Sequence, residues 1–171
     1  MSLKYGLLGL LNYFPMTGYA LSKTFQDSLS YFWQAQTSQI YRELNQMEVD
    51  GWLSSREEIQ TEKPNKRVYS ITEQGIAALQ KWLVSEPPRE FLPTRSEILL
   101  RIFFSAHSRV EDNLQMLHAI KEIYQLQCGQ MDEASEHIRH YAHLVGNETD
   151  AFYWELTADF GRRYSKMCLD W

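Results

Sequence analysis

The sequence contains few cysteines and no long apolar segment, and each shortage excludes a class of protein. Its 171 residues include two cysteines, Cys128 and Cys168, without the paired spacing of zinc ribbons or redox motifs, so we expect two free thiols. The longest apolar segments, 5–11 and 98–104, fall far short of the roughly 20 residues that a membrane-spanning helix needs. No secretory signal pattern is visible at the start, which indicates a cytoplasmic protein without a membrane partner.

Patterns that catalysis requires are also missing. There is no nucleophile beside a base, no glycine-rich phosphate loop and no carboxylate pair within an apolar segment. His137, His140 and His143 suggest a metal site, but a helix rotates the third well away from the first and leaves at most two converging ligands. We therefore predict no enzyme, cofactor or metal, and a metal-dependent enzyme using these histidines is the weakest of three hypotheses.

Charge is divided unequally along the chain. Residues 1–85 carry eight Lys/Arg and eight Asp/Glu, whereas residues 86–171 carry nine and fourteen, the whole net charge of −5. Bulk acidity opposes non-specific nucleic-acid binding. Any DNA contact must therefore come from a local basic patch in the first half.

Proline clusters at one point and divides the chain there. Three of the five prolines lie within 87–93, where they prevent a helix and favour an extended connector. We predict a first domain over 1–86, a connector over 87–94 and a second domain over 95–171. The expected fold class is mainly α, with α+β in the first domain and an all-α, coiled-coil-like second domain.

Apolar spacing in the first half predicts three helices, a hairpin and a fourth helix, the order found in a winged helix-turn-helix domain. A polar, turn-forming segment separates the two expected strands. The expected elements are helices at 3–13, 19–28 and 38–50, strands at 54–59 and 68–71, and a last helix capped by Thr72.

The third of these helices has the character of a DNA-recognition helix. Thr37 or Ser38 can act as its N-cap, and Ile40, Leu44 and Met47 recur on one side and should be buried. Polar side chains then face outward, where Gln can pair with adenine, Arg with guanine or phosphate, and Ser or Thr with phosphate. The residues expected at DNA are Thr37, Ser38, Gln39, Tyr41 and Arg42.

The turn of the hairpin adds three cations, Lys63, Lys66 and Arg67, which suit a phosphate or minor-groove contact. Nearby glutamates partly offset them, and a polar helix face is often merely solvated. A winged-helix module that binds protein instead of DNA therefore stays open as the second hypothesis.

The second half is predicted to contain only helices, and long ones. Two capping-box patterns, Thr94 to Glu97 and Ser108 to Glu111, mark helix starts, and no proline interrupts 110–145. Gly146 should end that long helix, and a last helix from about 150 carries a rich apolar stripe. Such a stripe needs a partner. We predict a homodimer held by Leu114, Leu117, Phe152, Leu156, Phe160, Tyr164 and Met167.

Aromatic residues are abundant, and most should lie in the core or the dimer interface, where rings dominate burial. Several could instead line a pocket between the domains for a small aromatic ligand. The candidates are Tyr31, Phe32, Trp33, Trp52, Trp82, Trp154 and Trp171.

These segments resemble the PadR family of bacterial transcriptional regulators. The resemblance rests on 5–11, 16–21, 39–44 running into 48–53, and 66–75. The second half is similar to the longer C-terminal domain of the subfamily that includes the phenolic-acid repressors and a virulence-gene activator, chiefly over 99–104. The resemblance implies a winged-helix homodimer, with C-terminal helices exchanged between or packed against the two subunits, that binds a pseudo-palindromic operator. We expect it to act as a repressor. In some members a small aromatic ligand releases the DNA.

Overall fold

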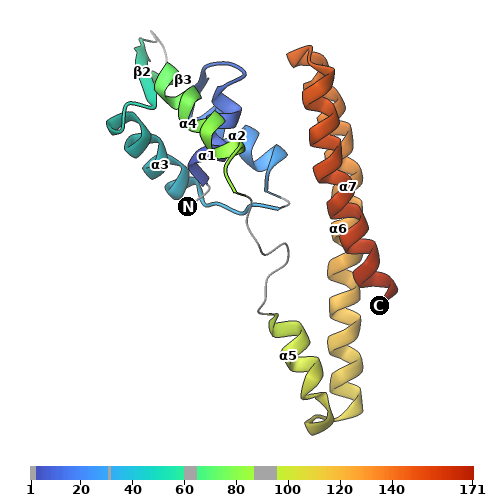
Figure 1. Cartoon of the computed structure of the whole chain (residues 1–171). Coiled ribbons are helices and arrows are strands. Elements are labelled where there is room, and N and C mark those ends of the chain that lie inside the picture. Colours follow the sequence, from blue (N-terminus) through green and yellow to red (C-terminus); the bar gives the residue numbers. More distant parts are fainter. Residues whose placement is uncertain (1–2, 31, 60–64, 87–95) are drawn as a thin grey trace.

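A small winged domain lies beside a helical arm in the computed structural model, which describes residues 3–30, 32–59, 65–86 and 96–171 (Figure 1). This arrangement confirms the predicted fold class, mainly helical with a small sheet in the first half. In chain order the elements are α1 (Leu3–Leu11), β1 (Met16–Thr17), α2 (Gly18–Ser28), α3 (Thr37–Val49), β2 (Leu53–Glu58), β3 (Lys66–Ile71), α4 (Glu73–Leu83), α5 (Glu97–Phe103), the 3₁₀ turn η1 (Ser105–His107), α6 (Val110–Val145) and α7 (Glu148–Asp170).

Side-chain caps fix the starts of several helices. The Thr17 hydroxyl accepts a hydrogen bond from the Ala20 N–H at the start of α2, and the Thr72 hydroxyl accepts one from Gly75 at the start of α4. Each bond satisfies a backbone donor that has no partner within the helix. The cap expected at Thr72 is therefore confirmed.

Two predicted helix starts are wrong. The N-cap of α3 is Gln36, in extended conformation, and not Thr37 or Ser38, because the Gln36 N–H finds its acceptor in the side chain of Gln39. The N-cap of α6 is Arg109 and not Ser108, since the Arg109 guanidinium pairs with Asp112 in the first turn.

At α5, Ser96 provides the cap through its hydroxyl. Thr94, where the first capping box was expected to begin, lies outside the described residues. The first helix also ends at Leu11 and not at residue 13, just before the turn that leads to Pro15.

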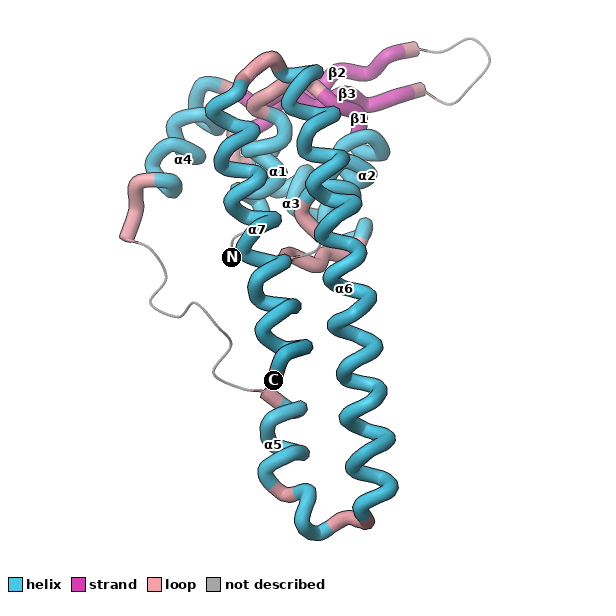
Figure 2. Tube along the Cα trace, turned by 90° about the vertical axis from the view of Figure 1, so that its right-hand side faces the viewer, coloured by secondary structure: helices cyan, strands magenta, loops and turns pink. Residues whose placement is uncertain are grey.

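The sheet of the winged domain has three antiparallel strands in the order β1, β3, β2. In the hairpin Leu53 pairs with Ile71 and Glu58 with Lys66, while the short β1 pairs Met16 with Tyr69. The β2–β3 hairpin projects from the body of the domain (Figure 2). The sequence patterns predicted the hairpin but not β1, because two residues are too few to show a periodicity.

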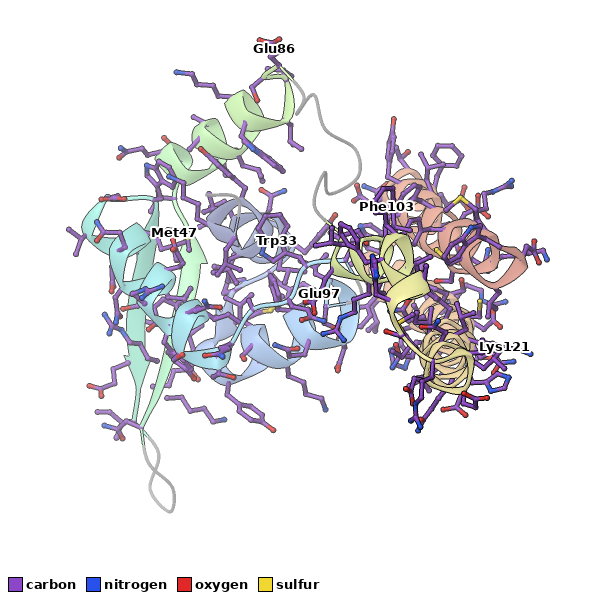
Figure 3. All side chains as sticks on the ribbon, turned by 90° about the horizontal axis from the view of Figure 1, so that it is seen from below. Trp33, Met47, Glu86, Glu97, Phe103 and Lys121 are labelled. Carbon is purple, nitrogen blue, oxygen red and sulfur yellow. The ribbon has the colours of Figure 1, made fainter. Side chains whose placement is uncertain are left out.

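The winged domain is built around one apolar core. The predicted inward face of α3 is confirmed, with Ile40 and Leu44 fully buried and Met47 1% exposed. Seen from below, Met47 lies within this domain, whereas Phe103 and Lys121 belong to the arm (Figure 3). The core residues are Leu7, Leu8, Leu11, Met16, Leu21, Phe25, Ile40, Leu44, Met47, Leu53, Tyr69 and Leu79.

The arm is an antiparallel pair of helices of unequal length. At about 1.5 Å per residue, the 36 residues of α6 extend further than the 23 residues of α7. The N-terminal part of α6 therefore runs beyond the end of α7, and α5 lies beside that part in two perpendicular views (Figures 1 and 2). No helix within the described ranges is long and apolar enough to cross a membrane.

Candidate DNA-binding surface

The outward face of α3 is polar and exposed. Thr37, Ser38, Gln39 and Arg42 are all exposed, on the side opposite the buried apolar residues of the helix. This accessibility agrees with the predicted recognition face. The first turns of a helix are the part that reads base edges when it enters a major groove.

Gln39 has a structural role that sequence reasoning missed. Its side-chain oxygen accepts a hydrogen bond of 2.9 Å from the backbone N–H of Gln36, which precedes the helix. Gln26 of α2 supports the same loop, because its side-chain amide donates 2.9 Å to the Ala35 carbonyl. The start of α3 is thus fixed from two sides.

Tyr41 is only partly available to a ligand. Its ring packs over Gly18, the first residue of α2: a Cβ atom on Gly18 would approach Cε1 of Tyr41 to 2.6 Å. Glycine is therefore the residue that permits this close approach of the two helices. Tyr41 joins α3 to α2 and still presents 39% of its surface to solvent.

The predicted wing cations differ in their surroundings. Lys66 lies at the start of β3 and is exposed, and Lys63 falls outside the described residues. Arg67 lies opposite Glu57, near the turn end of the hairpin, and its guanidinium pairs with the Glu48 carboxylate of α3 and donates 2.8 Å to the Ser55 hydroxyl. These contacts anchor the Arg67 side chain within the domain.

Tyr69 lies beneath this ion pair and is 2% exposed. The Arg67 guanidinium lies 5.4 Å from the centre of its ring. Burial raises the pKa of Tyr69, and this effect outweighs the opposing influence of Arg67, while Glu48 raises the pKa further. Tyr69 is therefore a neutral phenol at physiological pH.

A cavity of about 90 Å³ lies between the winged domain and the arm. Tyr13 and Leu29 line it from the winged domain, and Ile138, Tyr141 and Trp154 line it from the arm. The Tyr13 and Trp154 rings meet edge to face with centres 5.5 Å apart. The cavity is thus enclosed by both parts of the chain.

Burial raises the pKa of Tyr13, and the Asp150 carboxylate at the start of α7 raises it further.

Of the described aromatic residues singled out in the sequence, Trp154 borders this cavity. Trp52 and Trp82 instead pack with Tyr5, whose ring centre lies 4.8 Å from that of Trp82.

The arm carries an apolar surface that is exposed to solvent in the single chain. Of the seven residues predicted to hold a dimer, six are exposed: Leu114, Leu117, Phe152, Leu156, Phe160 and Met167. Tyr164 is partly covered within the chain, where its ring lies 6.4 Å from that of Tyr124. Helix α5 adds exposed Leu99, Leu100 and Phe103, which the prediction did not include.

Among the described side chains, which do not include that of His140, no group of three or more His, Cys, Asp or Glu has an arrangement that could hold a metal ion.

Comparison with known proteins identifies both halves of the chain. Residues 7–81 match the transcriptional regulator PadR-like family, and residues 94–171 match the virulence activator alpha C-term family. The negative transcriptional regulator PadR of Bacillus subtilis is 37% identical over 112 residues. That alignment covers 64% of this chain and 60% of the relative, so less than two thirds of the relative is spanned.

Solved structures share the fold over the full length of the chain. The crystal structure of Bacillus subtilis PadR in complex with operator DNA has a TM-score of 0.82 at 24% identity, covering 100% of this chain and 95% of that one. The structure of the same protein in complex with p-coumaric acid has a TM-score of 0.76 at 22% identity, covering 100% and 94%.

The predicted family is therefore confirmed, and because it is a family of transcription regulators, the prediction that the chain is not an enzyme agrees with it. The chain belongs to the PadR-like family of transcriptional regulators and carries a C-terminal domain of the virulence-activator type.

Proposed function

We propose that this protein is a homodimeric repressor that binds a pseudo-palindromic operator and leaves it when a small aromatic effector binds. The observation that carries the proposal is the exposed polar face of α3 beside a projecting β2–β3 hairpin, in which Lys66 at the start of β3 is exposed. A related protein with the same fold, Bacillus subtilis PadR, has been crystallised with operator DNA.

In this proposal α3 enters the major groove. Arg42 reads a guanine or a phosphate, Gln39 reads a base through the amide N–H groups that its capping bond leaves available, and Thr37 and Ser38 bind phosphate. Tyr41 contributes through its exposed edge. Lys63 and Lys66 of the hairpin contact the backbone or the minor groove.

Dimerisation is part of the DNA-binding mechanism. The winged half of the chain is neutral and the arm carries the whole charge of −5, so affinity cannot rest on bulk charge. A two-fold dimer places two recognition helices about 34 Å apart, one turn of DNA. The exposed apolar residues of α5, α6 and α7 supply the surface that such a dimer buries.

The cavity between the winged domain and the arm is the proposed effector site. A cavity of about 150 Å³ holds benzene in a protein core, whereas this one measures about 90 Å³. A substituted ring therefore fits only if the two walls move apart. Because one wall belongs to the DNA-binding domain, occupancy of the cavity shifts the recognition helices.

The test is a selection of duplexes from a random-sequence DNA pool with the full-length chain, followed by footprinting and binding in physiological salt. We expect an enriched, pseudo-palindromic sequence whose binding weakens when p-coumaric acid is added. Failure to enrich any sequence would reject the repressor and favour a winged-helix module that binds protein. Enrichment without any response to p-coumaric or related aromatic acids would reject only the effector.

A further inference from the structure

We infer that Arg67, Glu48 and Ser55 form a clamp that holds the wing at a set angle to the recognition helix, and that Arg67 supports operator binding through this clamp and not by touching DNA. The inference rests on the proposed function, because the clamp matters only if α3 and the wing engage one duplex together. It assigns Arg67 and Glu48 as positioning residues, whereas the neighbouring Lys66 meets the phosphates.

The clamp joins three elements through three side chains. Glu48 lies in the last turn of α3, Ser55 on β2, and Arg67 near the start of β3. The Ser55 hydroxyl donates 2.6 Å to one Glu48 carboxylate oxygen, and the Arg67 guanidinium pairs with the other. Arg67 also donates 2.8 Å to Ser55, which closes the ring of contacts.

The side of the hairpin that carries Arg67 also carries a core residue, Tyr69. Arg67 and Tyr69 are two residues apart on β3 and so lie on one side of the sheet, and Ser55 pairs directly with Tyr69. With Tyr69 buried below and the Arg67 guanidinium over its ring, the arginine stem has packing support as well as polar partners.

An isolated surface ion pair contributes little to stability. This one differs because Glu48 retains only 26% of its side-chain exposure and accepts from two donors. Such a network restricts the directions that both side chains can take. It ties the end of the recognition helix to the wing, the β2–β3 hairpin.

A clamp and a direct DNA contact predict different effects of charge removal on DNA binding. A phosphate-binding arginine releases counterions, and its loss lowers the salt dependence of binding. An arginine already neutralised by Glu48 releases none. On charge alone, removing the Glu48 carboxylate near DNA should strengthen binding, whereas loosening a clamp should weaken it.

The experiment measures the affinity of the full-length chain for the selected duplex and for a random-sequence duplex across a range of salt concentrations. The variants are Glu48→Gln, Arg67→Gln and their double, with Lys66→Gln as the charge-matched control. We expect Glu48→Gln and Arg67→Gln each to weaken binding to the selected duplex on the order of tenfold, and Arg67→Gln to leave the salt slope unchanged. The double variant should be no weaker than either single.

Lys66→Gln should instead lower the salt slope by about 0.9 and weaken both duplexes alike. Ser55→Ala provides a milder test, since it removes the bridging hydroxyl and no charge, and should weaken only the selected duplex. Thermal unfolding of each variant tells whether the wing is loosened or the whole fold is lost. Ser55→Ala and Glu48→Gln should still unfold in one cooperative transition, which means that the fold is intact.

Equal or tighter binding of the selected duplex by Glu48→Gln overturns the clamp, and so does a loss of salt slope in Arg67→Gln that matches Lys66→Gln. If the wild-type chain enriches no sequence at all, the proposed function and the clamp are rejected together. If the wild-type chain binds a selected duplex and Glu48→Gln binds it equally well, only the clamp is rejected.

Discussion

The ring of Tyr41 occupies the space that a side chain at Gly18 would need, with only 2.6 Å between Cε1 of Tyr41 and a Cβ atom built on Gly18. Gly18→Ala must displace the ring and with it the recognition helix. Overpacking of this kind costs about 1–3 kcal/mol. We expect a loss of that size in the free energy of unfolding by denaturant, together with weaker binding to the selected duplex.

Gly9→Ala is the matched control, since a Cβ atom there meets nothing within 4 Å. In the interior of α1 that substitution should stabilise the fold by up to about 1 kcal/mol. Equal stabilities for the two variants would show that the Tyr41 ring moves away without cost. The close packing of α2 and α3 would then not require glycine at position 18.

Arg42 should be the most sensitive position on the exposed face of α3. Arg42→Ala removes a side chain placed to read a base or phosphate, and we expect a loss of about 1–3 kcal/mol in binding to the selected duplex. Lys121→Ala removes the same charge from the arm, away from the winged domain (Figure 3), and should leave binding unchanged. Equal losses in a gel-shift titration would mean that only net charge matters.

Much of this fold could be predicted because its signals are local. Residues 110–145 lack proline and end at Gly146, and α6 spans Val110–Val145 with Gly146 in the left-handed conformation that favours glycine. The spacing of Ile40, Leu44 and Met47 likewise identified the buried side of α3, because a helix places such positions on one face.

The partners of individual polar side chains could not be predicted in the same way. Arg67 and Glu48 are 19 residues apart in sequence, and no local pattern links them. Read alone, an arginine beside a turn suggests a DNA contact, and a glutamine on a recognition helix suggests base reading. Tertiary packing instead directs Arg67 to the end of α3, and local geometry directs the Gln39 oxygen to Gln36.

The phenol of Tyr13 should make the contact between the winged domain and the arm sensitive to alkali. Burial and Asp150 raise its pKa above the ordinary value of 10.0, so the folded chain favours the neutral phenol. Its contribution to stability is fully present below pH 10 and is lost as pH rises through the raised pKa. The free energy of unfolding should therefore fall more steeply above pH 10 in the wild-type chain than in Tyr13→Phe.

The buried Tyr69 and the partly buried Tyr124 also have raised pKa values, and they titrate in both proteins. Only the difference between wild type and Tyr13→Phe therefore reports on Tyr13. Parallel stability curves between pH 9 and pH 11 would contradict the assignment of Tyr13 as a partly buried contact of the two domains.

The exposed apolar residues of α7 should determine both the oligomeric state and the affinity for DNA. Phe152 and Leu156 are 63% and 55% exposed, one helical turn apart. Phe152→Lys with Leu156→Lys places two charges where the proposed dimer buries apolar surface, so light scattering should report a monomer. Once the two recognition helices bind independently, affinity for the selected duplex should fall about a hundredfold or more.

The control adds the same charge without touching the apolar stripe. Gln115→Lys with Gln125→Lys changes two exposed polar positions of α6 and should leave a dimer that binds at least as tightly as wild type. The added lysines reduce the acidity of the arm in both double variants, so weaker binding by the α7 variant alone cannot arise from charge. A monomeric α7 variant that keeps full affinity would show that one winged domain suffices, and the role of the arm in DNA binding would be rejected.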